Sequence, residues 1–345
     1  MYASTSPEAG RDPRSEETRS RSGRAAAARS RGVPPPEVRP RGEARRYGSE
    51  APGGDDGKPD RESGAVDPDE VVPIRPLLSL AIAGFAALLG IGLVLGSQTA
   101  GPGTRLSFAF VVFGVQVLFV LAWTMALRPP ALWAVAGIGV GAGAVADAVA
   151  VSSEIAALGP LGYVVAGGFV AGVIGQLLRR QDRERMTESL GATLLIMVGV
   201  VSFATLIVLG RLPIGGAQAI FVALTAGAVA LTVAHLTDAA LPRPRLAPQV
   251  PRGAVGVVLG AMIGTLVSAV IGSYVVGFSP GSGAIIGFVT AGTAVLADLA
   301  ADYSEAGRQM AGDPPTMWIA RHMRGPLGGF ALAAPLSYAM SLLLL

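Results

Sequence analysis

Carboxylate and basic side chains gather where the apolar runs of the C-terminal half of the chain end. His235 and Asp238 are three residues apart, and Asp298 and Asp302 are four apart. Either spacing places both side chains on one face of a helix. Oxygen ligands on facing helices suit Mg²⁺, which takes one or two carboxylates together with water and substrate phosphate. Asp298, Asp238 and Asp302 are therefore candidate ligands of Mg²⁺; the alternative is that these acids only end helices at the level of the lipid headgroups.

A short cationic segment, residues 236–260, lies between two long apolar runs. Arg243, Arg245 and Arg252 punctuate it, and four prolines keep its middle from forming a helix. Such a loop holds guanidinium groups against a bilayer surface, where they can meet an anionic lipid. Residues 236–260 are therefore the segment where we expect chemistry with an anionic phospholipid.

These side chains must be positioned by membrane-spanning helices, because apolar runs of about 19–25 residues fill most of the chain after Pro76 and suit a hydrocarbon layer of about 30 Å. Backbone groups inside lipid must bond within their own segment, so the runs are expected to be helices. The predicted fold class is all-α, a polytopic transmembrane bundle of about nine spans. The spans are 77–96, 106–127, 130–150, 158–178, 190–210, 214–234, 254–278, 283–301 and 327–345.

The polar residues are concentrated at the N-terminus. Residues 1–75 hold 14 of the 27 Lys and Arg and 14 of the 24 Asp and Glu, without apolar periodicity. Such a segment cannot bury enough surface to offset its ordering entropy, so we expect a disordered cytoplasmic tail. The transmembrane domain then covers 76–345, with an N-terminal half at 76–210 and a second part at about 211–345. Cysteine is absent, which excludes disulfides and thiolate metal sites.

Arginines are unevenly shared between the two sets of loops. One set carries eleven and the other carries two, Arg105 and Arg211. The positive-inside rule then predicts a cytoplasmic N-terminus, an external C-terminus and a cytoplasmic 236–260 segment. The Ala, Gly and Arg bias suggests a high-GC bacterial sequence, so the inner membrane is the expected location.

Two further patterns concern packing. Gly256, Gly260 and Gly264 repeat every fourth residue, which predicts a helix that approaches its neighbours closely. Asp147 and Glu154 near the outer end of the third span are interpreted as an interfacial pair whose side chains reach the membrane surface.

The last third of the chain, roughly residues 227–345, resembles the phosphatidate cytidylyltransferase (CDP-diacylglycerol synthase) family. The family's cytoplasmic segment resembles Ser-Asp-Thr-Gly-Ala-Tyr followed by Leu-Ala-Pro-x-Ile-Ser-Pro-Lys-Lys-Thr-x-Glu-Gly, and later motifs contain Gly-Asp-Leu-x-Glu-Ser and a final Ala-Pro-x-x-Tyr. The corresponding segments here are Thr237–Ala240, Arg245–Gly253, Ala297–Leu299, Ser304–Arg308 and Ala333–Tyr338. The resemblance implies that the carboxylates hold a divalent metal. It also implies that Arg245, Arg252 and Arg308 bind the phosphates of CTP and phosphatidate.

The departures from the family pattern fall on its catalytic signature. Val250–Ala254 stands where the family has Ser-Pro-Lys-Lys-Thr, and residues 309–330 contain no Asp-Arg pair. Arginine for lysine keeps the charge but changes phosphate geometry. Three interpretations remain open: a pseudoenzyme that keeps an inner-leaflet pocket for anionic lipid or serves a partner, an active Mg²⁺-dependent nucleotidyltransferase of phospholipid metabolism, and a small transporter. No nucleic-acid partner is expected.

Overall fold

The computed structural model describes residues 71–99, 105–178, 186–213 and 215–344, which all belong to one compact unit, Arg61–Leu345. The disorder predicted for the tail concerns residues 1–70 almost entirely, and these lie outside the described residues. The described end of that segment, residues 71–75, is considered below with the site.

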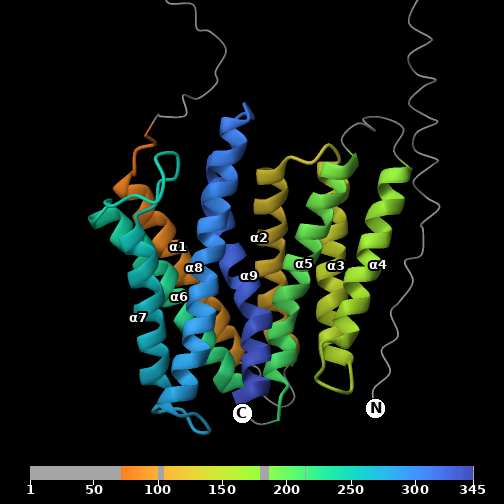
Figure 1. Ribbon diagram of the computed structural model, residues 1–345. Coiled ribbons are helices and arrows are strands. Elements are labelled where there is room, and N and C mark those ends of the chain that lie inside the picture. The colour runs from red at the N-terminus through yellow and green to blue at the C-terminus, as the bar shows by residue number, and fades with distance from the viewer. Residues whose placement is uncertain (1–70, 100–104, 179–185, 214, 345) are drawn as a thin grey trace, which may run out of the picture. The chain divides into compact units, whose positions relative to one another are not determined.

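The described residues form nine helices, each long and apolar enough to cross a membrane, which confirms the predicted fold class (Figure 1). Apart from one isolated bridge between Arg245 and Gly253, no extended pairing occurs in this part of the chain. In chain order the helices are α1 (Pro76–Gln98), α2 (Arg105–Leu127), α3 (Leu132–Ser152), α4 (Gly159–Leu177), α5 (Met186–Gly210), α6 (Gly216–Ala240), α7 (Ala254–Gly272), α8 (Pro280–Met310) and α9 (Trp318–Leu344).

Close packing of α7 against α6 follows from the glycine repeat, as predicted. A Cβ atom at Gly260 would lie 2.5 Å from the carbonyl oxygen of Ala230, and one at Gly264 would lie 2.6 Å from that of Ala226. Since neither approach leaves room for a side chain, the glycines allow the two backbones to touch.

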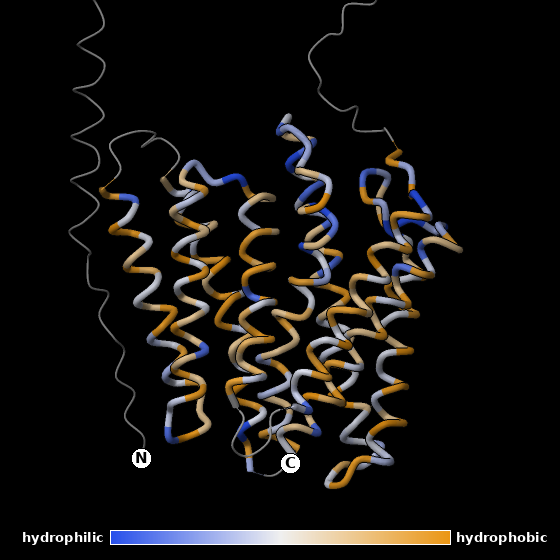
Figure 2. The backbone as a smooth tube through the Cα atoms, turned by 180° about the vertical axis from the view of Figure 1, so that it is seen from behind, coloured by the Kyte–Doolittle hydropathy of each residue, from blue (hydrophilic) through white to orange (hydrophobic). Residues whose placement is uncertain are grey.

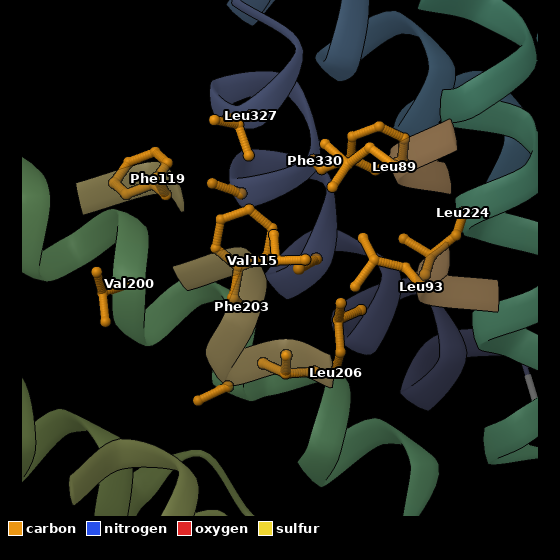
Figure 3. Close-up of a cluster of buried hydrophobic side chains, with 14 of the residues drawn as sticks. Leu89, Leu93, Val115, Phe119, Val200, Phe203, Leu206, Leu224, Leu327 and Phe330 are labelled. Atoms are coloured by element: carbon orange, nitrogen blue, oxygen red, sulfur yellow. The ribbon is translucent and has the colours of Figure 1, made fainter. Parts of the chain in front are cut away.

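The apolar core lies where α1, α2, α5, α6 and α9 meet (Figure 3). Phe203 of α5 packs edge-on against Phe119 of α2, with ring centroids 5.7 Å apart. Figure 3 shows Phe330 of α9 beside Leu89 of α1 in the same cluster. This core fixes the helix ends that carry the polar residues.

The largest difference from the predicted spans concerns α8 and α9. The apolar run of α8 was expected to end at Ala301, but the helix continues to Met310; α9 begins at Trp318, nine residues before the expected Leu327. Figure 2 shows these extensions as the hydrophilic end of the bundle. Hydropathy does not detect these helical extensions because they contain charged side chains. In the structure these charges pair with one another rather than facing lipid.

Candidate functional site

The polar residues of four segments come together at one end of the bundle. The C-terminal ends of α6 and α8, the start of α9 and the loop 241–253 all lie there, at the top of Figure 1. The predicted acids Asp238 and Asp298 are fully enclosed, with relative exposures of 1% and 2%.

Arg252 joins these acids. Arg252 is 1% exposed, its Nη1 lies 2.9 Å from Oδ2 of Asp298, and its Nε lies 3.2 Å from Oδ2 of Asp238. Asp302, which is partly exposed, is more distant, with 3.9 Å between Nε of Arg252 and its Oδ2. His235 completes the group: its Nε2 lies 3.0 Å from Asp298 Oδ2, and its Nδ1 lies 2.8 Å from Arg252 Nη1. We call these five residues the Arg252 cluster.

Two glycines make the Arg252 cluster sterically feasible. A Cβ at Gly325 of α9 would lie 2.0 Å from Oδ1 of Asp298, so only glycine fits beside that carboxylate. A Cβ at Gly256 of α7 would lie 2.5 Å from Oδ1 of Asp238. The same Oδ1 accepts a hydrogen bond from the backbone N–H of Gly253 at 2.9 Å, which anchors the loop to α6.

Arg252 stays charged in this environment. Burial by itself lowers the pKa of its guanidinium, but the carboxylates of Asp298, Asp302 and Asp238 outweigh burial and raise that pKa above its ordinary value. A permanent cation therefore stands among three carboxylates, and it offsets the cost of enclosing them.

A second ion-pair cluster, centred on Glu305, holds the ends of α8 and α9 together. Glu305 is 2% exposed and pairs with Arg308 and with Arg324, whose Nη2 lies 3.4 Å away. Thr316, in the connection between the helices, donates to Glu305 through its backbone N–H at 3.2 Å and its hydroxyl at 2.7 Å. Arg308 also donates to the carbonyl of Ala126 at the end of α2. These contacts are structural and fix the geometry beside the Arg252 cluster.

A cavity of about 250 Å³ opens beside the Arg252 cluster. Three arginines line it, Arg75, Arg252 and Arg321, together with the two histidines of the chain and two carboxylates. Nη2 of Arg252 is buried and has no hydrogen-bond partner among the described residues. The lining consists of Val72, Pro73, Ile74, Arg75, Leu78, Ser79, Ile82, His235, Pro251, Arg252, Asp298, Asp302, Thr316, Trp318, Arg321, His322 and Gly325.

An apolar hollow adjoins this cavity. It is formed by the start of α1 and by Trp318 of α9, and it shares Ile74, Arg75, Leu78 and Trp318 with the cavity. The arginine-lined cavity and the apolar hollow therefore share one wall, an arrangement that suits an amphiphilic ligand.

Residues 71–75 form part of that wall. The backbone N–H of Val72 donates to the carbonyl of Pro248 at 3.0 Å, and Arg245 donates to the carbonyl of Val72. These hydrogen bonds tie residues 71–75, which we call the wall segment, onto the loop 241–253.

The six residues singled out from the sequence have different surroundings. Asp238, Asp298, Asp302 and Arg252 converge as described, whereas Arg245 holds the wall segment and Arg308 holds Glu305. The sequence interpretation did not assign Arg75, Arg321 or His322 to the site. The position of Arg321 and His322 at the start of a helix was hidden because the apolar run begins only at Leu327.

A magnesium ion does not fit the Arg252 cluster as it stands. The guanidinium occupies the space between the two carboxylates that would bind the ion, and it forms ion pairs with both of them. Among the described residues, no group of three or more His, Asp or Glu side chains is placed to hold a metal. The predicted Mg²⁺ site is therefore left without support from the geometry, and we derive no chemistry from it.

The interpretation of Asp147 and Glu154 as an interfacial pair is wrong. Asp147 is only 5% exposed and its Oδ1 accepts a hydrogen bond from Nε2 of Gln116 at 2.8 Å, while Glu154 is exposed in the following loop. A glutamine on the neighbouring helix, which hydropathy alone does not pair with an acid, keeps the carboxylate inside.

Fold and site together define a multi-pass membrane protein of helical type with a buried guanidinium–carboxylate cluster at one end. Comparisons with family models, with curated proteins and with solved structures find no match to this chain.

Proposed function

We propose that this protein binds the phosphate headgroup of an anionic membrane lipid of the phosphatidate class in the cavity beside the Arg252 cluster. The observation that carries the proposal is the junction of a cavity lined by Arg75, Arg252 and Arg321 with an apolar hollow. Guanidinium groups bind phosphate by charge-assisted hydrogen bonds, and the hollow gives an acyl chain an apolar wall. The uneven distribution of arginines supports a cytoplasmic position for the cavity, so the ligand is an inner-leaflet lipid of a bacterial membrane.

We further propose that nucleotidyl transfer is lost. Catalysis of such transfers depends on positioning and on neutralising charge at the phosphates, usually with divalent metal. Here Arg252 is already paired with the carboxylates that would hold the metal. A cavity of about 250 Å³ is also small beside the roughly 300–1,000 Å³ of sites that enclose whole small molecules, so it suits a headgroup better than CTP.

The test is lipid binding by the full-length protein in phosphatidylcholine nanodiscs. Phosphatidate is expected to raise the unfolding temperature of the protein, and Arg321→Gln is expected to weaken that binding about tenfold, since a hydrogen bond to a charged group contributes about 1.5–3 kcal/mol. Arg243→Gln is the matched control because Arg243 is exposed at the same end of the bundle and lines a different surface hollow.

Two results would contradict the proposal. Equal phosphatidate binding by Arg321→Gln and by the unaltered protein would exclude the cavity as the binding site. Robust formation of CDP-diacylglycerol from CTP and phosphatidate with Mg²⁺, abolished in Asp298→Asn, would show that the protein is an active cytidylyltransferase.

A further inference from the structure

A second polar site lies at the opposite end of the bundle, between α2 and α3. Asp147 is five residues before the end of α3 at Ser152, so its Cα lies about 7.5 Å inside the helix end. The hydroxyl of Tyr338, near the end of α9, donates to the carbonyl of Ala156 in the loop that follows α3. The start of α9, in contrast, lies at the Arg252 cluster. The two sites are therefore at different membrane faces.

Oxygen acceptors surround the amide nitrogen of Gln116 in the polar centre of this site. Nε2 of Gln116 donates to Oδ1 of Asp147 at 2.8 Å and to the carbonyl of Val200 at 3.1 Å. Because Oδ1 of Asp147 and the carbonyl of Val200 are both acceptors, the nitrogen of the Gln116 amide must face them. Its oxygen, Oε1, therefore points to the other side. Among the described residues, neither Oε1 of Gln116 nor Oδ2 of Asp147 has a hydrogen-bond partner, although both are buried.

Gly143 makes room for this arrangement. A Cβ at that position would lie 2.8 Å from Oε1 of Gln116, so a larger residue would displace the amide. A glycine that leaves space beside an unpaired oxygen shows that the polar centre is built into the packing of α2, α3 and α5.

An apolar groove of about 420 Å³ leads to Asp147. Every lining residue except the aspartate is apolar, and Phe110 is 73% exposed at its surface. The lining comprises Leu106, Ala109, Phe110 and Phe113 from α2, and Ala144, Asp147, Ala148 and Val151 from α3.

We infer that this groove binds a single-chain primary amine dissolved in the membrane, with its ammonium group on Asp147 and its hydrocarbon chain in the groove. A carboxylate at this depth is costly unless it is paired with a cation or a donor. The unpaired Oδ2 of Asp147 matches an ammonium, which has three donors and no acceptor. Among the described side chains that line the groove, none is basic and able to pair with a phosphate, which favours an ammonium carried directly on the chain over a phospholipid headgroup.

Binding of dodecylamine to the full-length protein in phosphatidylcholine nanodiscs tests this inference, with dodecanol and dodecyltrimethylammonium as comparisons. We expect saturable stabilisation by dodecylamine and at least tenfold weaker effects of the alcohol, which lacks charge, and of the quaternary amine, which lacks N–H donors. Asp147→Asn is expected to lose the preference for the amine, and Glu154→Gln, an exposed carboxylate at the same end, is expected to keep it.

A second variant covers the case in which Asp147→Asn folds poorly. Ala148 is exposed on the groove, so Ala148→Phe should fill the groove without disturbing the core and should also abolish amine binding. Unchanged dodecylamine binding in Ala148→Phe, or equal binding of dodecanol by the unaltered protein, would overturn the inference.

Discussion

Replacement of Arg252 by methionine is the most direct test of the structure. Methionine has a similar reach but no charge, so the change leaves Asp238 and Asp298 enclosed without their cation. Removing one partner of a buried ion pair typically costs about 3–5 kcal/mol of folding free energy. For a chain of this size the unfolding temperature should fall by roughly 6–20 °C.

The same variant should also gain a binding site for a divalent cation. With the guanidinium absent, the carboxylates of Asp238, Asp298 and Asp302 face a shared space that suits a divalent cation. Mg²⁺ or Mn²⁺ should therefore stabilise Arg252→Met; a concentration 100 times the dissociation constant contributes about 2.7 kcal/mol. Thermal unfolding in detergent, with and without metal and chelator, measures both effects.

A double variant separates charge from packing. Asp238→Asn combined with Arg252→Met removes one acid together with the cation, so the double variant should be less destabilised than Arg252→Met alone. The reasoning fails if Arg252→Met is as stable as the unaltered protein. It also fails if Mg²⁺ or Mn²⁺ stabilises the unaltered protein as strongly as the variant, because the guanidinium then does not exclude the ion.

Three further changes should each reduce stability, as measured by thermal unfolding. Gly325→Ala places a methyl group 2.0 Å from Asp298 Oδ1 and should cost about 1–3 kcal/mol, whereas alanine at the open Gly307 should cost nothing measurable. Glu305→Gln leaves its arginines without a buried counter-charge and should cost about 3–5 kcal/mol, while Asp313→Asn, at an exposed position, should be neutral. Gly264→Leu should separate α6 from α7 and destabilise the protein by several times more than Gly292→Leu, where no neighbouring atom lies within 4 Å. Equal effects within any of these pairs would contradict the corresponding packing argument.

The sequence predicted the number and type of the helices because lipid imposes a length and an apolar composition on each span. It was less informative where helices continue beyond the apolar layer. Asp298, Asp302 and Glu305 follow helical spacing, but hydropathy falls at these residues, and the end of α8 was therefore placed nine residues too early.

The placement of Asp238 and Asp298 at the same membrane face followed from spacing and from the alternation of spans, but their convergence did not. The role of Arg252 did not follow, because spacing along the chain says nothing of the distance between a loop and two helices. A cation and a metal ion satisfy the same carboxylates, so the acids alone could not distinguish a magnesium site from an arginine site. Asp147 illustrates the same limit, since its partner Gln116 is 31 residues away in the sequence.

The wall segment has a practical consequence for anyone who shortens this protein. A version beginning at Pro76 would retain every helix that the structure describes, yet lack the backbone that bonds to Pro248 and the Arg75 side chain that lines the cavity. A version that begins at Val71 instead would preserve the wall segment of the cavity. The apparent boundary between tail and bundle is therefore not a safe place to cut.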